Sequence, residues 1–85
     1  MAKISLYLNS KASSAKLDWV NQFQRGFFRH ELEVKTPGSR EELHEEIESD
    51  IENSVDYIFC VGGDGTVNTI LQKIVGSGIK LLIVP

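Results

Sequence analysis

Apolar residues along the chain follow two periods, and the two periods alternate. Four short runs have the length and composition of strands, at residues 4–8, 32–36, 57–61 and 79–84. Between these runs, apolar positions recur every three or four residues, as on one face of a helix. These positions are Leu17, Val20, Phe23 and Phe27, then Leu43, Ile47 and Ile51, then Val67, Ile70, Leu71, Ile74 and Val75. The alternation predicts a βαβαβαβ chain with a parallel sheet, right-handed crossovers and helices on both faces.

Turn and capping signals mark the boundaries of these elements. Pro37-Gly38 ends the second strand, and Ser39-Arg40-Glu41-Glu42 has the serine and glutamate of a capping box, so we expect the second helix to follow Ser39. The run 57–61 is continuously apolar, which predicts a strand buried on both faces. Residues 79–84 are apolar except for Lys80, and we expect both runs to form central strands.

Composition narrows the class of protein. Eighty-five residues suffice for one small domain, and 41% hydrophobic with 25% charged residues is typical of a folded globular chain. A net charge of −3 gives no basic patch for nucleic acid, and no apolar run approaches the roughly 20 residues that span a bilayer. The N-terminal residues lack the features of a signal peptide, and the single cysteine fits a reducing compartment. We therefore expect a cytoplasmic protein.

Several conspicuous side chains have a simple structural interpretation. The acidic run 41–52 is expected to form the solvated face of a helix, and Cys60 to be a buried thiol in a strand. His30 and His44 have no partner spacing for metal binding, so we expect them at the surface or at a helix end. The aromatic residues expected in the core are Trp19, Phe23, Phe27 and Phe28.

The stretch Gly62-Gly63-Asp64-Gly65-Thr66 lies between a strand and a helix that we expect to begin near Thr66 or Val67. Glycines allow backbone N–H groups to approach phosphate oxygens, and a helix N-terminus attracts anions. The alternative is a tight turn, in which Asp64 or Thr66 only caps the helix. Asn9, Thr36 and Pro85 follow the other strands, and ligands bind at this edge of such sheets. The sequence therefore predicts an anion site there.

The run Gly62-Gly63-Asp64-Gly65-Thr66-Val67-Asn68 resembles the signature of the diacylglycerol kinase catalytic domain, in a superfamily with sphingosine kinases and NAD kinases. The resemblance extends over essentially the whole chain, through Asn9-Ser10-Lys11 and Thr36, and Asn68 favours the lipid-kinase branch. It implies a three-layer, Rossmann-like α/β fold, the N-terminal part of the diacylglycerol/NAD kinase-like fold.

The resemblance also implies ATP and Mg²⁺ as cofactors. The residues it implies in nucleotide binding are Gly62, Gly63, Gly65, Thr66, Asn68, Thr36 and Asn9. Asp64 is implied at the site of phosphoryl transfer, where it would hold the metal or accept the hydroxyl proton, and both roles stay open.

Two features depart from the family pattern. Thr69 stands where relatives commonly carry glutamate, and the chain ends at Pro85, where the family continues into a β-rich, lipid-binding domain. We therefore expect residues 1–85 to be a single nucleotide-binding α/β domain, truncated, without the β-rich domain and inactive alone.

The function expected from these features is an ATP-dependent lipid kinase that transfers the γ-phosphoryl group to a lipid hydroxyl. The lipid would be diacylglycerol-like or sphingoid and would be bound through the missing domain. The alternatives are an NAD kinase-type phosphotransferase and a non-catalytic α/β module for nucleotide binding or interaction. Peripheral membrane contact and self-association remain open expectations.

Overall fold

The computed structural model describes residues 2–8, 14–26, 29–61 and 64–84, with the side chains of 14–17, 19 and 64 left out. Its elements come in the predicted order. They are β1 (Lys3–Leu8), α1 (Ser14–Gly26), β2 (Glu31–Lys35), α2 (Arg40–Glu52), β3 (Tyr57–Val61), α3 (Asp64–Ile74) and β4 (Lys80–Val84).

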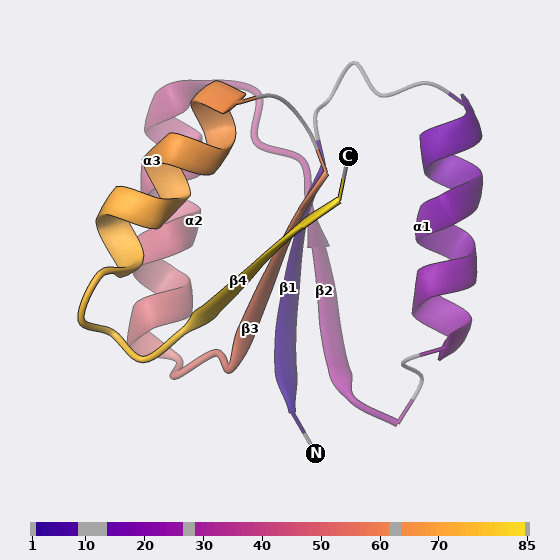
Figure 1. Cartoon of the computed structure of the whole chain (residues 1–85), viewed down its shortest axis with the longest axis horizontal. Coiled ribbons are helices and arrows are strands. Elements are labelled where there is room, and N and C mark those ends of the chain that lie inside the picture. Colours follow the sequence, from indigo (N-terminus) through magenta and orange to yellow (C-terminus); the bar gives the residue numbers. More distant parts are fainter. Residues whose placement is uncertain (1, 9–13, 27–28, 62–63, 85) are drawn as a thin grey trace.

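The strands form one parallel sheet in the order β2-β1-β3-β4. α1 lies on one face of the sheet, and α2 and α3 lie side by side on the other (Figure 1). The predicted three-layer, Rossmann-like α/β fold is therefore confirmed. Because all strands are parallel, their carboxyl ends meet at one edge of the sheet, where the loops leading into the helices gather.

A hydrophobic cluster fills the space on each face of the sheet. The buried residues beneath α2 and α3 are Tyr7, Leu43, Ile47, Val55, Ile58, Cys60, Ile70 and Ile74. Those beneath α1 are Leu6, Leu8, Val20 and Val61. Phe23 packs against the second cluster, with its ring edge-on to Phe59 at 4.7 Å between centroids, which confirms its predicted core position. The predictions for Trp19, Phe27 and Phe28 fall on side chains outside the described set.

The prediction that residues 79–84 form a central strand is wrong. β4 lies at the edge of the sheet, whereas β1 and β3 are central. As a result Leu82 and Ile83 are 41% and 58% exposed, and Leu71 on α3 and Val75 directly after it are also exposed. An apolar run fits a strand at either place, so composition does not encode strand order. Self-association and membrane contact stay predictions.

The entry into α2 matches the predicted cap. Ser39 Oγ accepts a hydrogen bond from the Glu42 N–H at 3.1 Å, and Glu42 Oε2 accepts one from the Gly38 N–H at 2.9 Å. The glutamate thus reaches one residue further back than in the usual capping box. Both bonds fix the short connection between β2 and α2.

The cysteine and the two histidines differ in how far they match the prediction. Cys60 is fully buried, and burial raises the pKa of its thiol, as expected for an inert core cysteine. His30 is exposed and accepts a hydrogen bond from the Ala2 N–H, whereas His44 is half-buried on α2. Within the described residues, no helix is long and apolar enough to cross a membrane.

Candidate anion-binding site

A pocket of about 460 Å³ opens at the carboxyl edge of the sheet. β1 contributes Tyr7 and Leu8 to its lining, and α3 contributes Gly65, Thr66 and Thr69. The third wall is the segment from Pro37 to Arg40, together with Leu43 of α2. The pocket therefore lies where the N-terminal ends of α2 and α3 meet the end of a central strand.

α3 begins at Asp64, two residues before the earliest start that we predicted. Gly65 and Thr66 are consequently in the first helical turn, whose backbone N–H groups have no partner within the helix. Thr69 lies one turn further along and donates its hydroxyl to the Gly65 carbonyl at 3.0 Å. The positive end of the helix dipole thus borders the pocket, and this arrangement favours an anion.

Gly65 is not explained by the fold alone. Its φ is not positive, and a Cβ built at this position meets no atom within 4 Å. In a helix, glycine is less favourable than alanine by up to about 1 kcal/mol. The space that the missing side chain leaves belongs to the pocket, so the glycine allows a ligand to approach the backbone closely.

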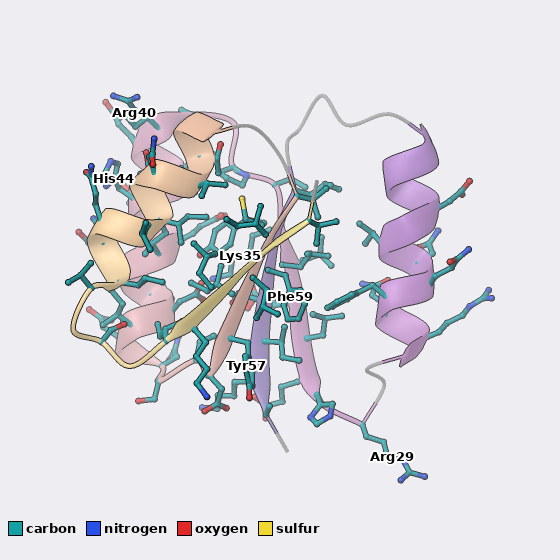
Figure 2. The ribbon with its side chains drawn as sticks, viewed as in Figure 1. Arg29, Lys35, Arg40, His44, Tyr57 and Phe59 are labelled. Atoms are coloured by element: carbon teal, nitrogen blue, oxygen red, sulfur yellow. The ribbon has the colours of Figure 1, made fainter. Side chains whose placement is uncertain are left out.

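The wall formed by α2 offers a second helix N-terminus. Gly38, Ser39 and Arg40 line the pocket, and Arg40 is the one charged residue of the described lining. Figure 2 shows its side chain directed outward, away from the sheet. In this conformation the guanidinium points away from the sheet, and the Gly38 N–H donates to Glu42 Oε2.

The structure brings together only some of the residues predicted for the site. Gly65 and Thr66 line the pocket as expected. Thr36 is exposed one residue before the wall, and Asn68 is exposed on α3; neither belongs to the lining. The predictions for Gly62, Gly63, Asn9 and the Asp64 side chain lie outside the described part of the chain, as do those for Lys11 and Pro85.

Some lining residues were missed at the level of sequence. Thr69 was considered only as a departure from the family pattern, although it lies three and four positions after Thr66 and Gly65 and so shares their helix face. Tyr7 was assigned only to its strand. Its place in the lining follows from the strand order, which the sequence pattern does not contain.

A second polar feature lies beneath the pocket and corrects the interpretation of the acidic run. Asp50 of α2 is not solvated but 2% exposed. Its Oδ1 accepts from Ser5 Oγ at 2.8 Å and from Lys35 Nζ at 2.7 Å, and its Oδ2 accepts from the Tyr7 hydroxyl. Asp50 continues the stripe of Leu43 and Ile47, so it faces the sheet rather than solvent.

Tyr7 takes part in this cluster as a donor. Burial, followed by the hydrogen bond to the Asp50 carboxylate and the charge of that group, raises the pKa of the Tyr7 phenol well above its ordinary value. The hydroxyl is therefore protonated at neutral pH. It holds its partner in place and does not act as a base toward a ligand in the pocket.

Glu46 also differs from the prediction that the acidic residues of α2 are solvated. Its Oε2 is a buried side-chain atom without a hydrogen-bond partner among the described residues. Desolvation by burial raises the pKa of the Glu46 carboxyl. The positive charge of Lys35 lowers this pKa in part, and the negative charges of neighbouring carboxylates raise it further. The folded state therefore favours the protonated form of Glu46. The stability that protonated Glu46 contributes is lost as pH rises through its folded-state pKa.

Glu46→Gln is expected to raise the free energy of unfolding at pH 7. The gain should shrink to zero as pH falls below the ordinary pKa of glutamate, because the native side chain is then protonated as well. Urea unfolding at several pH values measures this, with Glu45→Gln at an exposed position of the same helix as control. A gain that persists unchanged at low pH would contradict the electrostatic explanation.

The described residues suit phosphate better than a bare metal ion. None of the described His, Cys, Asp and Glu side chains form a group of three or more that could hold a metal. The described lining offers two helix N-termini and the hydroxyl of Thr66, which are donors for phosphate oxygens, whereas the Thr69 hydroxyl donates to the Gly65 carbonyl. A cation would therefore need a ligand from the Asp64 side chain, which lies outside the described set, or from the bound anion.

Comparison with protein families identifies the family of the chain. The family model described as the diacylglycerol kinase catalytic domain matches residues 3–85. The match contains every described element and the whole lining of the pocket. A search of the curated proteins gives no match to the chain.

Proposed function

Because the chain belongs to the diacylglycerol kinase catalytic domain family, we propose that it is the nucleotide-binding part of an ATP-dependent lipid kinase. The enzyme would transfer the γ-phosphoryl group of ATP to the hydroxyl of a diacylglycerol-like or sphingoid lipid. The observation that carries the proposal is the pocket at the start of α3, where Gly65 leaves room for a ligand beside unpartnered backbone N–H groups. The buried, reduced Cys60 is compatible with the cytoplasmic location that we also propose.

In this proposal the nucleotide phosphates occupy the pocket. Gly65 and Thr66 bind them through their backbone N–H groups, with Gly62 and Gly63 completing the loop, as the family resemblance implies. Thr36, Asn68 and Asn9 would contact the remainder of the nucleotide. Thr36 and Asn68 are both exposed, so these contacts require the nucleotide to extend beyond the pocket.

Mg²⁺ would neutralise charge on the phosphates during transfer, and Asp64 would hold it or accept the proton of the lipid hydroxyl. Phosphoryl transfer depends mainly on in-line positioning and charge stabilisation. Asp64 is the first residue of α3 and precedes Gly65 of the pocket lining, which supports this proposal. A carboxylate there is also compatible with the helix dipole.

Asp64→Asn is expected to abolish lipid phosphorylation while leaving the fold intact. The assay uses a chimera in which residues 3–85 replace the matching segment of an active diacylglycerol kinase, with Mg²⁺ and radiolabelled ATP. Loss of metal binding or of the base lowers phosphoryl transfer by about 100-fold or more. Asp18→Asn, the same change at an exposed position of α1, is the control and should retain full activity.

The acceptor is tested in the same assay. Residues 3–85 are carried into a diacylglycerol kinase and, separately, into an NAD kinase, each chimera is offered the acceptor of its host, and the proposal expects label only in the lipid product. Label in NAD would instead support an NAD kinase-type phosphotransferase. A folded chimera that binds Mg-ATP and labels none of the acceptors would favour the non-catalytic module.

A further inference from the structure

A buried charged cluster joins two walls of the candidate pocket. Asp50, in the last turn of α2, binds Tyr7 and Ser5 of β1 and Lys35 of β2. Asp50 and Lys35 are only 2% and 8% exposed, and Figure 2 shows Lys35 at the centre of the molecule. Neither of these two residues lines the pocket.

Stability does not explain why charges occupy this place. Burial penalises both ions, and a buried ion pair can often be replaced by apolar side chains at no loss of stability. The position of Asp50 near the C-terminus of α2 adds a further cost, because the helix dipole there is negative and no basic residue lies in the last turn. An apolar residue would simply have continued the stripe of Leu43 and Ile47.

The cluster connects the strand ends that support the pocket. Tyr7 and Lys35 are register partners on adjacent strands, so one carboxylate holds the ends of both. Tyr7 itself borders the pocket, on β1. Lys35 is the last residue of β2, and the wall formed by Pro37 to Arg40 begins only two residues later. Lys35 Nζ also lies 3.5 Å from the Glu46 carbonyl, which ties β2 to α2 a second time.

We infer that Asp50 and Lys35 are positioning residues, which hold the end of β1 and the wall between β2 and α2 in the geometry that binds the nucleotide phosphates. The inference rests on the function proposed above for its ligand. The positioning itself is attributed to the ion pair between Lys35 and Asp50. Charged groups that must meet at fixed distances specify one arrangement of strand ends, whereas apolar side chains tolerate several.

The test is the double variant Lys35→Met/Asp50→Asn, which removes both charges of the ion pair; it also removes the cation that opposes the raised pKa of Glu46. Asparagine keeps one acceptor oxygen, for Ser5 Oγ, and places its NH2 group opposite the Tyr7 hydroxyl, which can accept from it; the tie to β2 is lost. Tyr7→Phe is a second variant, which removes only the hydroxyl. Ile74→Val is the matched control, because Ile74 is buried in the hydrophobic cluster that also contains Tyr7 but does not border the pocket.

Two readouts are recorded on folded, labelled protein: amide shifts of the free chain and the Kd for Mg-ATP. We expect the double variant to move the amide signals of Gly38, Ser39 and Arg40 and to weaken Mg-ATP binding by about two- to thirtyfold. Tyr7→Phe should act in the same direction. Ile74→Val should leave both the wall signals and the affinity unchanged.

The outcomes separate this inference from the proposed function. Shifts confined to the neighbours of the substituted residues, with wild-type affinity, would overturn the positioning role and leave the cluster purely structural. If the unmodified chain does not bind Mg-ATP, the proposed function fails. In that case the positioning role is still decided by whether the double variant moves the amide signals of Gly38, Ser39 and Arg40 in the free chain.

Discussion

Asp50→Asn alone is expected to lower the free energy of unfolding by about 3–5 kcal/mol, because it leaves the Lys35 ammonium buried without its counter-ion. The amide also presents N–H groups to a site where three donors already converge. A domain of this size has a total stability on the order of 4–13 kcal/mol. The single substitution should therefore remove a large part of it.

Urea unfolding followed by circular dichroism measures this loss. Asp18→Asn, the same substitution at an exposed site on α1, is the control and should change stability by no more than about 0.5 kcal/mol. Adding Lys35→Met to Asp50→Asn should restore much of the loss, since the stranded charge is then gone. A loss of less than about 1 kcal/mol in the single variant would mean that Lys35 finds solvent or another partner.

Gly65→Val is expected to weaken Mg-ATP binding by at least about 100-fold, because the branched side chain occupies the space through which phosphate reaches the backbone N–H groups. Gly65→Ala should have a smaller effect in the same direction. Alanine at this helical position should at the same time stabilise the fold by up to about 1 kcal/mol, since no atom lies within 4 Å of the added Cβ. The account thus predicts a gain in stability together with a loss of affinity.

Gly26→Ala is the matched control for this experiment. Gly26 is also a helical glycine whose Cβ would meet nothing within 4 Å, and it lies at the end of α1, outside the pocket lining. It should leave the affinity for Mg-ATP unchanged. If Gly65 serves only the turn between β3 and α3, its replacement should instead alter stability without any effect on binding.

The elements of the fold could be predicted from the sequence because each depends on local pattern. The predicted strand 57–61 has the bounds of β3, and the capping residue Ser39 begins α2 as expected. Strand order depends on contacts between distant segments, so the apolar run of β4 did not show that it lies at the edge. The start of α3 was misplaced because the first turn of a helix makes few internal hydrogen bonds and glycine gives no propensity signal.

The candidate site was predictable where its residues are adjacent in sequence. Gly65 and Thr66 are consecutive residues in the first turn of α3, and both line the pocket. Tyr7 and the wall before α2 join them only through the sheet. Asp50 could have been noticed, since a charge three residues after Ile47 falls on the apolar stripe, but its partner Lys35 emerges only from the pairing of β1 with β2.

We propose that the pocket at the start of α3 binds the phosphates of a nucleotide. Titration of the labelled 85-residue chain with Mg-ATP, followed by amide NMR, tests it most directly. The account predicts saturable shifts concentrated at Gly65, Thr66 and Thr69 and at the wall residues Gly38 to Arg40, with loss of these shifts in Gly65→Val. A folded chain whose pocket amides do not respond to Mg-ATP would contradict the account.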